Sequence, residues 1–158
     1  MLFFVPPPDA APHSSLVEML AIAGARFGSP DPPFVCNVHP DGSWVLDANQ
    51  CVDWFERRID LNEACLVAGT AFSFVQLLDQ LAAEDRRFEL PAGSVAMETG
   101  GYKGRSRELP KAGLHALITE RLGVAPGRIV CEYGMSELGS QAYDRVAGAT
   151  DERRCFHF

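Results

Sequence analysis

Two short segments of the chain combine glycines with charged or hydroxyl side chains, which are the residue types that bind phosphorylated ligands. The first is METGGYKGRSRE, residues 97–108, where Gly100 and Gly101 let the backbone approach a ligand closely. Consecutive N–H groups at such glycines can form an anion-binding nest. Four cations oppose only Glu108 over nine residues of a chain whose formal charge is −7: Lys103, Arg105, Arg107 and Lys111. We interpret this segment as a phosphate- or carboxylate-binding loop; a solvated loop with two turn glycines is the alternative.

The second segment is EYGMSELGSQ, residues 132–141. We expect a strand to end here, Gly134 to turn the chain, and Ser136 and Glu137 to lie side by side just beyond. A hydroxyl and a carboxylate provide the oxygen ligands that Mg²⁺ prefers, and Tyr133 adds a flat ring. In the alternative interpretation, Ser136 only caps a short helix and Tyr133 is half-buried.

Two further segments could border a ligand. GTAFSF, residues 69–74, places small residues and two aromatics at a predicted strand-to-helix turn, which suits an apolar wall. Core packing of Phe72 and Phe74 is the alternative. In PHSS, residues 12–15, His13 could titrate near neutral pH, although a surface residue or part of a helix cap has the same appearance.

The elements that must position these segments alternate along the chain. Five short apolar runs predict strands, at residues 2–5, 34–38, 65–68, 94–98 and 128–132. Four helices are predicted by apolar periodicity, each after a start signal. The signals are a capping box of Ser15 with Glu18, a cap of Asp47 with Gln50, the turn at residues 69–70, and Pro110. This alternation predicts an α/β fold, with a mostly parallel sheet and flanking helices.

The topology of such a sheet predicts where the ligand-binding segments meet. Right-handed crossovers bring the loops that follow parallel strands to one edge of the sheet, where ligands bind. We therefore expect residues 6–15, 69–74, 99–107 and 133–141 to converge.

Composition limits the class of protein. The chain has 158 residues with 47% hydrophobic and 22% charged residues, which fits one globular domain, and its net negative charge argues against nucleic-acid partners. No apolar run is long enough for a transmembrane helix, and we predict a cytoplasmic protein. The five cysteines lack CxxC spacing, which argues against a disulfide framework or structural zinc. We predict that Cys131 is an inert core thiol.

Together the segments resemble the LuxE-type acyl-protein synthetases, or long-chain fatty acid–luciferin-component ligases. These belong to the adenylate-forming superfamily, near the phenylacetate–CoA ligases. The resemblance spans about residues 1–144, as the central part of an adenylation domain, and implies a partial adenylate-forming N-terminal domain core. Residues 145–158 are expected to be a polar tail, either disordered or a truncated continuation.

The resemblance implies roles for particular residues. Those implied to bind ATP are Gly100, Gly101, Tyr102, Tyr133, Gly134 and Ser136. Ser136 would contact the α-phosphate and Glu137 would hold Mg²⁺, which makes these two the expected catalytic residues. The residues implied to border the acyl pocket are His13, Gly69, Thr70 and Ala71.

The implied reaction is ATP-dependent activation of a carboxylic acid, such as a long-chain fatty acid, through an acyl-adenylate. The acyl group then passes to an acceptor thiol or protein. The family's Ser/Thr/Gly-rich phosphate loop and its C-terminal catalytic lysine do not occur in the sequence, so we expect a central slice of such an enzyme. A truncated sheet would expose an edge strand, which predicts self-association or pairing with the missing parts.

Two other functions remain open. A non-catalytic binding or regulatory module could keep the fold without the reaction. An unrelated doubly wound nucleotide-binding protein would place the two glycine-containing motifs far apart.

Overall fold

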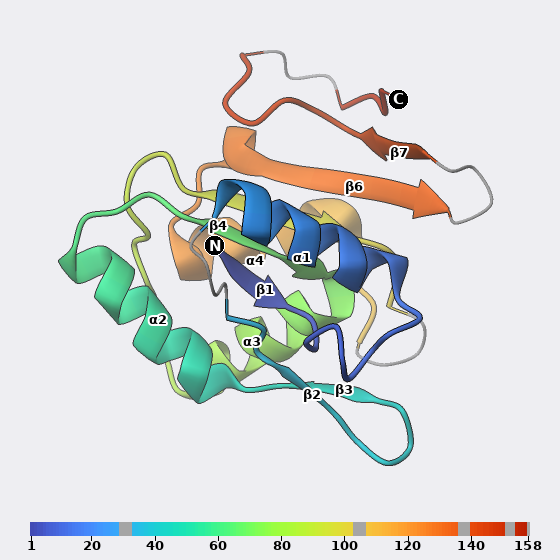
Figure 1. Cartoon of the computed structure of the whole chain (residues 1–158). Helices are drawn as coiled ribbons and strands as arrows, with labels where there is room; N and C mark the ends of the chain where they lie inside the picture. The colour runs from blue at the N-terminus through green and yellow to red at the C-terminus, as the bar shows by residue number, and fades with distance from the viewer. Residues whose placement is uncertain (29–32, 103–106, 136–139, 151–153, 158) are drawn as a thin grey trace.

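A five-stranded sheet forms the framework of the protein, in a computed structural model that describes residues 1–28, 33–102, 107–135, 140–150 and 154–157 (Figure 1). Its strand order is β1-β4-β5-β6-β7. The bounds are Leu2–Phe4 for β1, Leu66–Thr70 for β4, Val95–Thr99 for β5, Ile129–Met135 for β6 and Ser140–Tyr143 for β7. The first four strands are parallel and β7 runs antiparallel to β6. The predicted α/β fold with a mostly parallel sheet is confirmed.

Helices cover both faces of this sheet. The bounds are Ser15–Phe27 for α1, Ala48–Asp60 for α2, Ala71–Ala83 for α3 and Lys111–Leu122 for α4; a short 3-10 helix, η1, spans Pro126–Arg128. Side chains of a strand point alternately to its two faces. Phe3 and Val5 therefore pack with α1, whereas Leu2 and Phe4 pack into the larger core formed with α2, α3 and α4.

The helix ends test the predicted caps. The cap of α1 is Ser14, whose side chain accepts a hydrogen bond from the Val17 N–H at 3.3 Å, so the predicted capping box at Ser15 was wrong by one residue. The predicted cap of α2 is confirmed, because Asp47 accepts from the Gln50 N–H at 3.0 Å. Pro110 precedes α4 as predicted.

The predicted second strand is wrong in length and in partner. Residues Cys36–Val38 form β2, which pairs antiparallel with β3, Trp44–Leu46, in a separate two-stranded sheet. Phe34 makes only an isolated bridge to Phe3. The signal that could have revealed this hairpin is the Asp41-Gly42 pair, a common hairpin turn.

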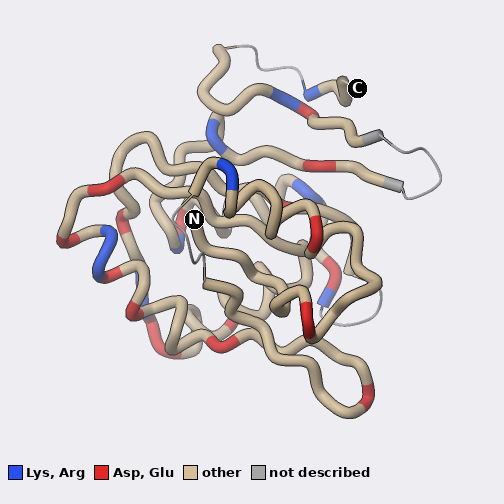
Figure 2. The backbone as a smooth tube through the Cα atoms, in the orientation of Figure 1, with Lys and Arg blue, Asp and Glu red and all other residues tan. Residues whose placement is uncertain are grey.

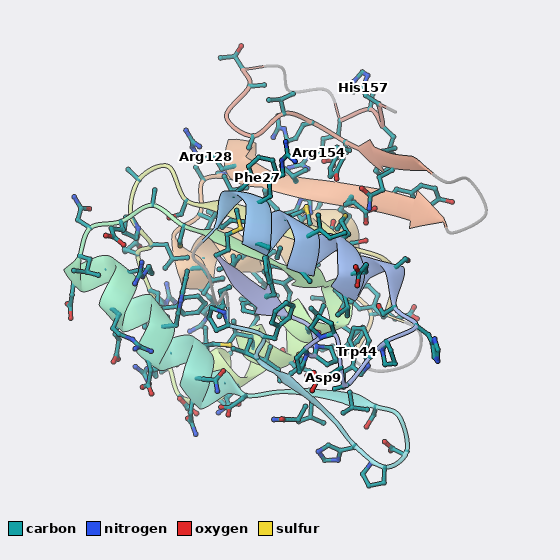
Figure 3. All side chains as sticks on the ribbon, in the orientation of Figure 1. Asp9, Phe27, Trp44, Arg128, Arg154 and His157 are labelled. Carbon is teal, nitrogen blue, oxygen red and sulfur yellow. The ribbon has the colours of Figure 1, made fainter. Side chains whose placement is uncertain are left out.

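The end of the predicted fifth strand also needs correction. Gly134 does not turn the chain, because β6 continues to Met135 and Gly134 pairs with Gln141 of β7. Beyond β7 the chain first contacts η1, where the Gly148 N–H donates to the Gly127 carbonyl, and residues near His157 then lie beside β7 (Figure 3). Tyr143 and His157 exchange two backbone hydrogen bonds of 3.0 Å, and Arg154 pairs with the buried Asp144 at 2.7 Å.

Helix α2 carries many charged side chains. Acidic and basic residues are numerous along α2 (Figure 2), where Arg58 pairs with Glu63, and Glu56 with Arg86 of the following segment. No helix within the described residues is long and apolar enough to cross a membrane.

Candidate functional site

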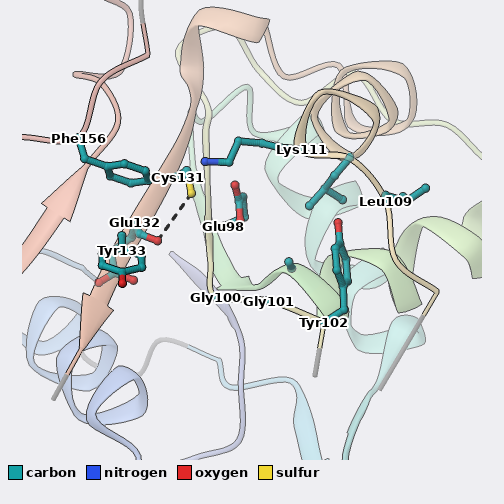
Figure 4. Close-up of a pocket in the computed structure, with 12 residues that line it drawn as sticks. Glu98, Gly100, Gly101, Tyr102, Leu109, Lys111, Cys131, Glu132, Tyr133 and Phe156 are labelled. Carbon is teal, nitrogen blue, oxygen red and sulfur yellow. Dashed lines mark hydrogen bonds between the residues drawn. The ribbon is translucent and has the colours of Figure 1, made fainter. Parts of the chain in front are cut away.

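Two cavities open side by side at the carboxyl ends of the parallel strands. The first, which we call the charged cavity, measures about 410 Å³ and contains Glu98, Lys111 and Glu132 in its lining (Figure 4). The second, which we call the hydroxyl cavity, measures about 430 Å³, and Ser14, Ser15, Thr70 and Thr99 line it. Gly100 and Gly101 line both cavities. The predicted convergence of the four loops is confirmed for their described residues.

Two buried polar pairs hold the carboxylates that line the charged cavity. Glu98, on β5, is only 3% exposed, and its Oε1 lies 3.1 Å from Nε2 of the buried His115, on α4. The neighbouring Thr99 hydroxyl donates a hydrogen bond to the Glu132 carboxylate, on β6. Buried polar groups are stable only when they are paired in this way.

The titration of Glu132 is shifted by its surroundings. Burial raises the pKa of its carboxyl group, and the nearby charge of Glu98 raises it further, whereas the hydrogen bond from Thr99 opposes the shift. Glu132 therefore binds a proton more readily than an exposed glutamate.

Cys131 forms part of the same wall. Burial raises the pKa of its thiol to about 12, and Glu98 adds to the shift, although the Lys111 ammonium opposes it. A thiol with this pKa is protonated at neutral pH and is a poor nucleophile. Burial of Cys131 is as predicted, and that its thiol is inert stays a prediction.

Aromatic rings and one cation frame the mouth of the charged cavity. The Phe156 ring, from the tail, lies 5.7 Å from the Tyr133 ring, and the Lys111 ammonium lies 4.9 Å from the Phe156 ring centroid. Tyr102 lines the cavity from the loop after β5. The cavity thus combines flat apolar surfaces with an amine and a carboxylate.

The hydroxyl cavity contains fewer charges. The first turn of α1 and the cap of α3 contribute the hydroxyls of Ser14 and Thr70, and the rings of Trp44 and Phe72 lie 6.0 Å apart in its wall. Helix N-termini attract anions. The arrangement suits a small anionic group attached to an apolar one.

Glycine is favoured at positions 100 and 134 for two different structural reasons. Gly100 has a φ of 71°, in the left-handed region that favours glycine. At Gly134, an added Cβ would lie 2.6 Å from Oε1 of Glu132. Gly134 therefore leaves room for the Glu132 carboxylate that Thr99 binds.

The structure separates the predicted site residues into groups. Tyr102, Tyr133 and Ala71 line the charged cavity, whereas His13, Thr70 and Gly134 line the hydroxyl cavity. Gly69 packs against β1 instead, since a Cβ on it would lie 2.5 Å from the Cβ of Phe4. The residues Ser136, Glu137, Lys103 and Arg105 lie outside the described residues.

One predicted cation is already paired. Both Arg107 Nε and its Nη2 donate to the Asp79 carboxylate, over distances of 2.6 to 3.1 Å. Its charge is therefore offset locally, which weakens the predicted cationic character of this loop.

Sequence reasoning missed several side chains that shape the two cavities. Glu98 and Glu132 are polar residues in apolar strand segments, and their position at the strand ends is the signal that could have identified them. Trp44 belongs to the hairpin that was not predicted. Within the described ranges, no group of three or more His, Cys, Asp or Glu residues could hold a metal ion, and the predicted Mg²⁺ ligand Glu137 lies outside them.

The fold and these cavities define an α/β protein with two adjoining cavities at the carboxyl ends of its parallel strands. A scan against protein-family models and searches of curated proteins and of solved structures found no match for this chain.

Proposed function

We propose that this chain provides the central part of an enzyme that activates a carboxylic acid with ATP, as an acyl-adenylate, and passes the acyl group to a thiol. The observation that carries the proposal is the pair of adjoining cavities that share Gly100 and Gly101. The missing phosphate loop and catalytic lysine would come from the rest of a longer acyl-protein synthetase.

The reaction requires two reactants in contact. A carboxylate oxygen forms a bond to the α-phosphorus of ATP, the bond from that phosphorus to the bridging oxygen breaks, and pyrophosphate leaves. Holding both reactants in the correct geometry removes much of the barrier. Two compartments with a common glycine wall could hold them side by side.

The charged cavity fits a nucleotide base better than an acyl chain. Tyr102 and Tyr133 offer ring faces for stacking, the Glu98 carboxylate can accept a hydrogen bond from an amino group, and Lys111 can approach a phosphate or ribose oxygen. When bound, ATP supplies the electrophilic phosphorus and the pyrophosphate leaving group. The residues of this chain position it and exclude water.

Mg²⁺ would neutralise the phosphates in this reaction. Glu137 and Ser136 remain the proposed magnesium and α-phosphate ligands, on the strength of the sequence motif.

The hydroxyl cavity fits the carboxylic acid. The hydroxyls of Ser14 and Thr70 and the N-terminal turn of α1 would bind the carboxylate, and Trp44 and Phe72 would contact the acyl group. His13 lies at the same opening and is exposed.

Calorimetric titration tests the proposal. We expect the chain to bind ATP·Mg²⁺, and to bind a nonhydrolysable acyl-adenylate analogue at least about tenfold more tightly, because the analogue fills both compartments. Tyr133→Ala should lower the affinity for both ligands by about tenfold, because the stacking contact is lost. Tyr143→Ala, at an exposed residue of β7, is the matched control and should leave both affinities unchanged. Failure of both ligands to bind, or equal effects of the two variants, would contradict the proposal.

The absence of a phosphate loop from the sequence favours one second candidate, a non-catalytic nucleotide-binding module. ATP–pyrophosphate exchange separates the two functions. Exchange by this chain would reject the hypothesis of a non-catalytic binding module. Exchange only after the missing segments are supplied would support the proposal that the chain is the central part of an enzyme.

A further inference from the structure

The hairpin of β2 and β3 forms one wall of the hydroxyl cavity through Trp44. Each strand has three residues, and an isolated hairpin of that size is marginally stable in water. Trp44 points from the hairpin toward the body of the molecule (Figure 3), where its ring meets that of Phe72. Something besides the hairpin must therefore hold this wall in place.

Gln76 of α3 provides that support. Its Oε1 accepts a hydrogen bond from the Leu46 N–H at 3.1 Å, and its Nε2 donates to the Trp44 carbonyl at 3.2 Å. The side-chain amide thus binds β3 as a neighbouring strand would. Because Phe72 and the cap residue Thr70 also belong to the start of α3, the two sides of the cavity are fixed to one another.

The lining limits how much apolar ligand surface can be buried. Three large apolar side chains, Leu16, Trp44 and Phe72, belong to the lining formed by the described residues, where the others are Gly, Ser, Thr or His. Apolar burial stabilises a ligand in proportion to the area removed from water. An acyl chain that extends beyond these three side chains gains little further.

We infer that the hydroxyl cavity takes a carboxylate with a compact acyl group, shorter than a long-chain fatty acid, and that Trp44 limits its length. Trp44 is the specificity-determining residue and Gln76 is its positioning residue. This inference rests on the proposed function, since it names the substrate class of the same site, and it departs from the long-chain acid that the family resemblance implies.

A chain-length series tests the role of Trp44. Hexanoate and tetradecanoate, each below its micelle concentration, are titrated into the wild type, Trp44→Ala and Val45→Ala. We expect the wild type to bind hexanoate at least as tightly as tetradecanoate, and Trp44→Ala to shift the affinity ratio at least tenfold toward tetradecanoate. Val45, the exposed neighbour in β3, is the control and should leave the ratio unchanged. A wild type that prefers tetradecanoate by tenfold, or an unchanged ratio in Trp44→Ala, would overturn the inference.

A second series tests Gln76 even if Trp44→Ala fails to fold. Gln76→Met removes both hydrogen bonds to β3 at similar side-chain volume, and should shift the same ratio three- to tenfold toward tetradecanoate. Gln76→Glu keeps the acceptor for the Leu46 N–H and should give a smaller shift. Gln80→Met, one turn further along α3, is the matched control, because the Gln80 side chain is exposed and donates to Glu84 at 3.0 Å. Equal ratios in Gln76→Met and Gln80→Met would overturn the positioning role.

A parallel titration with ATP·Mg²⁺ distinguishes this inference from the proposed function. If ATP binds and the ratio of hexanoate to tetradecanoate affinity is the same in the wild type and Trp44→Ala, the inference fails but the proposed function stands. If carboxylates bind with the expected dependence on Trp44 but ATP does not, the proposed reaction fails and the cavity assignment stands. Absence of any carboxylate binding overturns both.

Discussion

The charged and hydroxyl cavities share a wall but differ in how their polar groups are held. In the charged cavity, Glu98 and Glu132 lie within the sheet, are 3% and 4% exposed, and depend on His115 and Thr99 as partners. In the hydroxyl cavity, Ser15 and His13 are exposed and lie in the turn before or at the start of a helix.

This difference separates two kinds of site. Buried partners fix the carboxylates of the charged cavity, so that the shape of the cavity and the stability of the fold depend on the same residues there. In the hydroxyl cavity, Ser14 and Thr70 cap α1 and α3, whereas Ser15 and His13 are exposed, and Trp44 and Phe72 form the apolar wall. Substitution of Glu98 should therefore lower stability, whereas in the hydroxyl cavity the cap residue Ser14 should affect stability and the exposed Ser15 should not.

The largest expected effect follows from Glu98→Ala. It leaves His115 buried without its partner, and we expect a loss of about 3 kcal/mol in the free energy of unfolding, measured by urea denaturation. Glu98→Gln keeps a hydrogen-bonding group at this position and should cost less. Glu108→Ala, at an exposed acid of the loop before α4, is the control and should change stability by less than about 0.5 kcal/mol. Equal losses in Glu98→Ala and Glu108→Ala would show that the pairing of Glu98 with His115 does not stabilise the folded state.

Much of the fold was predictable because apolar periodicity records which faces are buried. The four parallel strands of the sheet, the four helices and the caps at Asp47 and Pro110 follow from that pattern, whereas the antiparallel β7 was not predicted. The hairpin of β2 and β3 did not follow, because strands of three residues are too short to show alternation. The extension of β6 through Gly134 was missed because glycine usually marks a turn, whereas here it leaves space for Glu132.

The site was predictable only in part, for a related reason. Sequence motifs identify loops, and topology places them at one edge, as it does for Gly100 and Tyr133. The residues that complete the cavities come from elements remote in sequence: His115 from α4, Trp44 from β3 and Phe156 from the tail. Their pairing depends on tertiary packing, which a single sequence does not record.

A pH series gives the second prediction and tests whether Glu132 is as buried as Glu98. Burial raises the pKa of the Glu132 carboxyl above its ordinary value of 4.5, so between that value and the raised one the folded state binds more protons than the unfolded state. The free energy of unfolding should therefore fall as pH rises through this window. Glu132→Gln keeps an acceptor for Thr99 and removes the titration. Its free energy of unfolding, relative to that of the wild type, should therefore increase from pH 4 to pH 7.

Urea denaturation at several pH values gives the measurement, with Glu108→Gln as the control. Groups that do not interact with Glu132 titrate equally in both proteins, so their contributions cancel in the difference between variant and wild type. A difference between Glu132→Gln and wild type that does not change with pH would mean that Glu132 is solvated.

The smallest expected effect concerns the serines of the hydroxyl cavity, where the structure corrected the predicted helix cap. Ser14 accepts from the Val17 N–H, so Ser14→Ala should cost about 1 kcal/mol in the free energy of unfolding. Ser15 is exposed and does not cap the helix, so Ser15→Ala should change stability by less than about 0.5 kcal/mol. Both hydroxyls line the cavity, and under the proposed function both variants should weaken carboxylate binding. Thermal and urea denaturation of the two variants, beside carboxylate titration, separate the two roles. A larger stability loss in Ser15→Ala than in Ser14→Ala would place the cap at Ser15, as the sequence predicted. The Ser15 hydroxyl would then have a structural role.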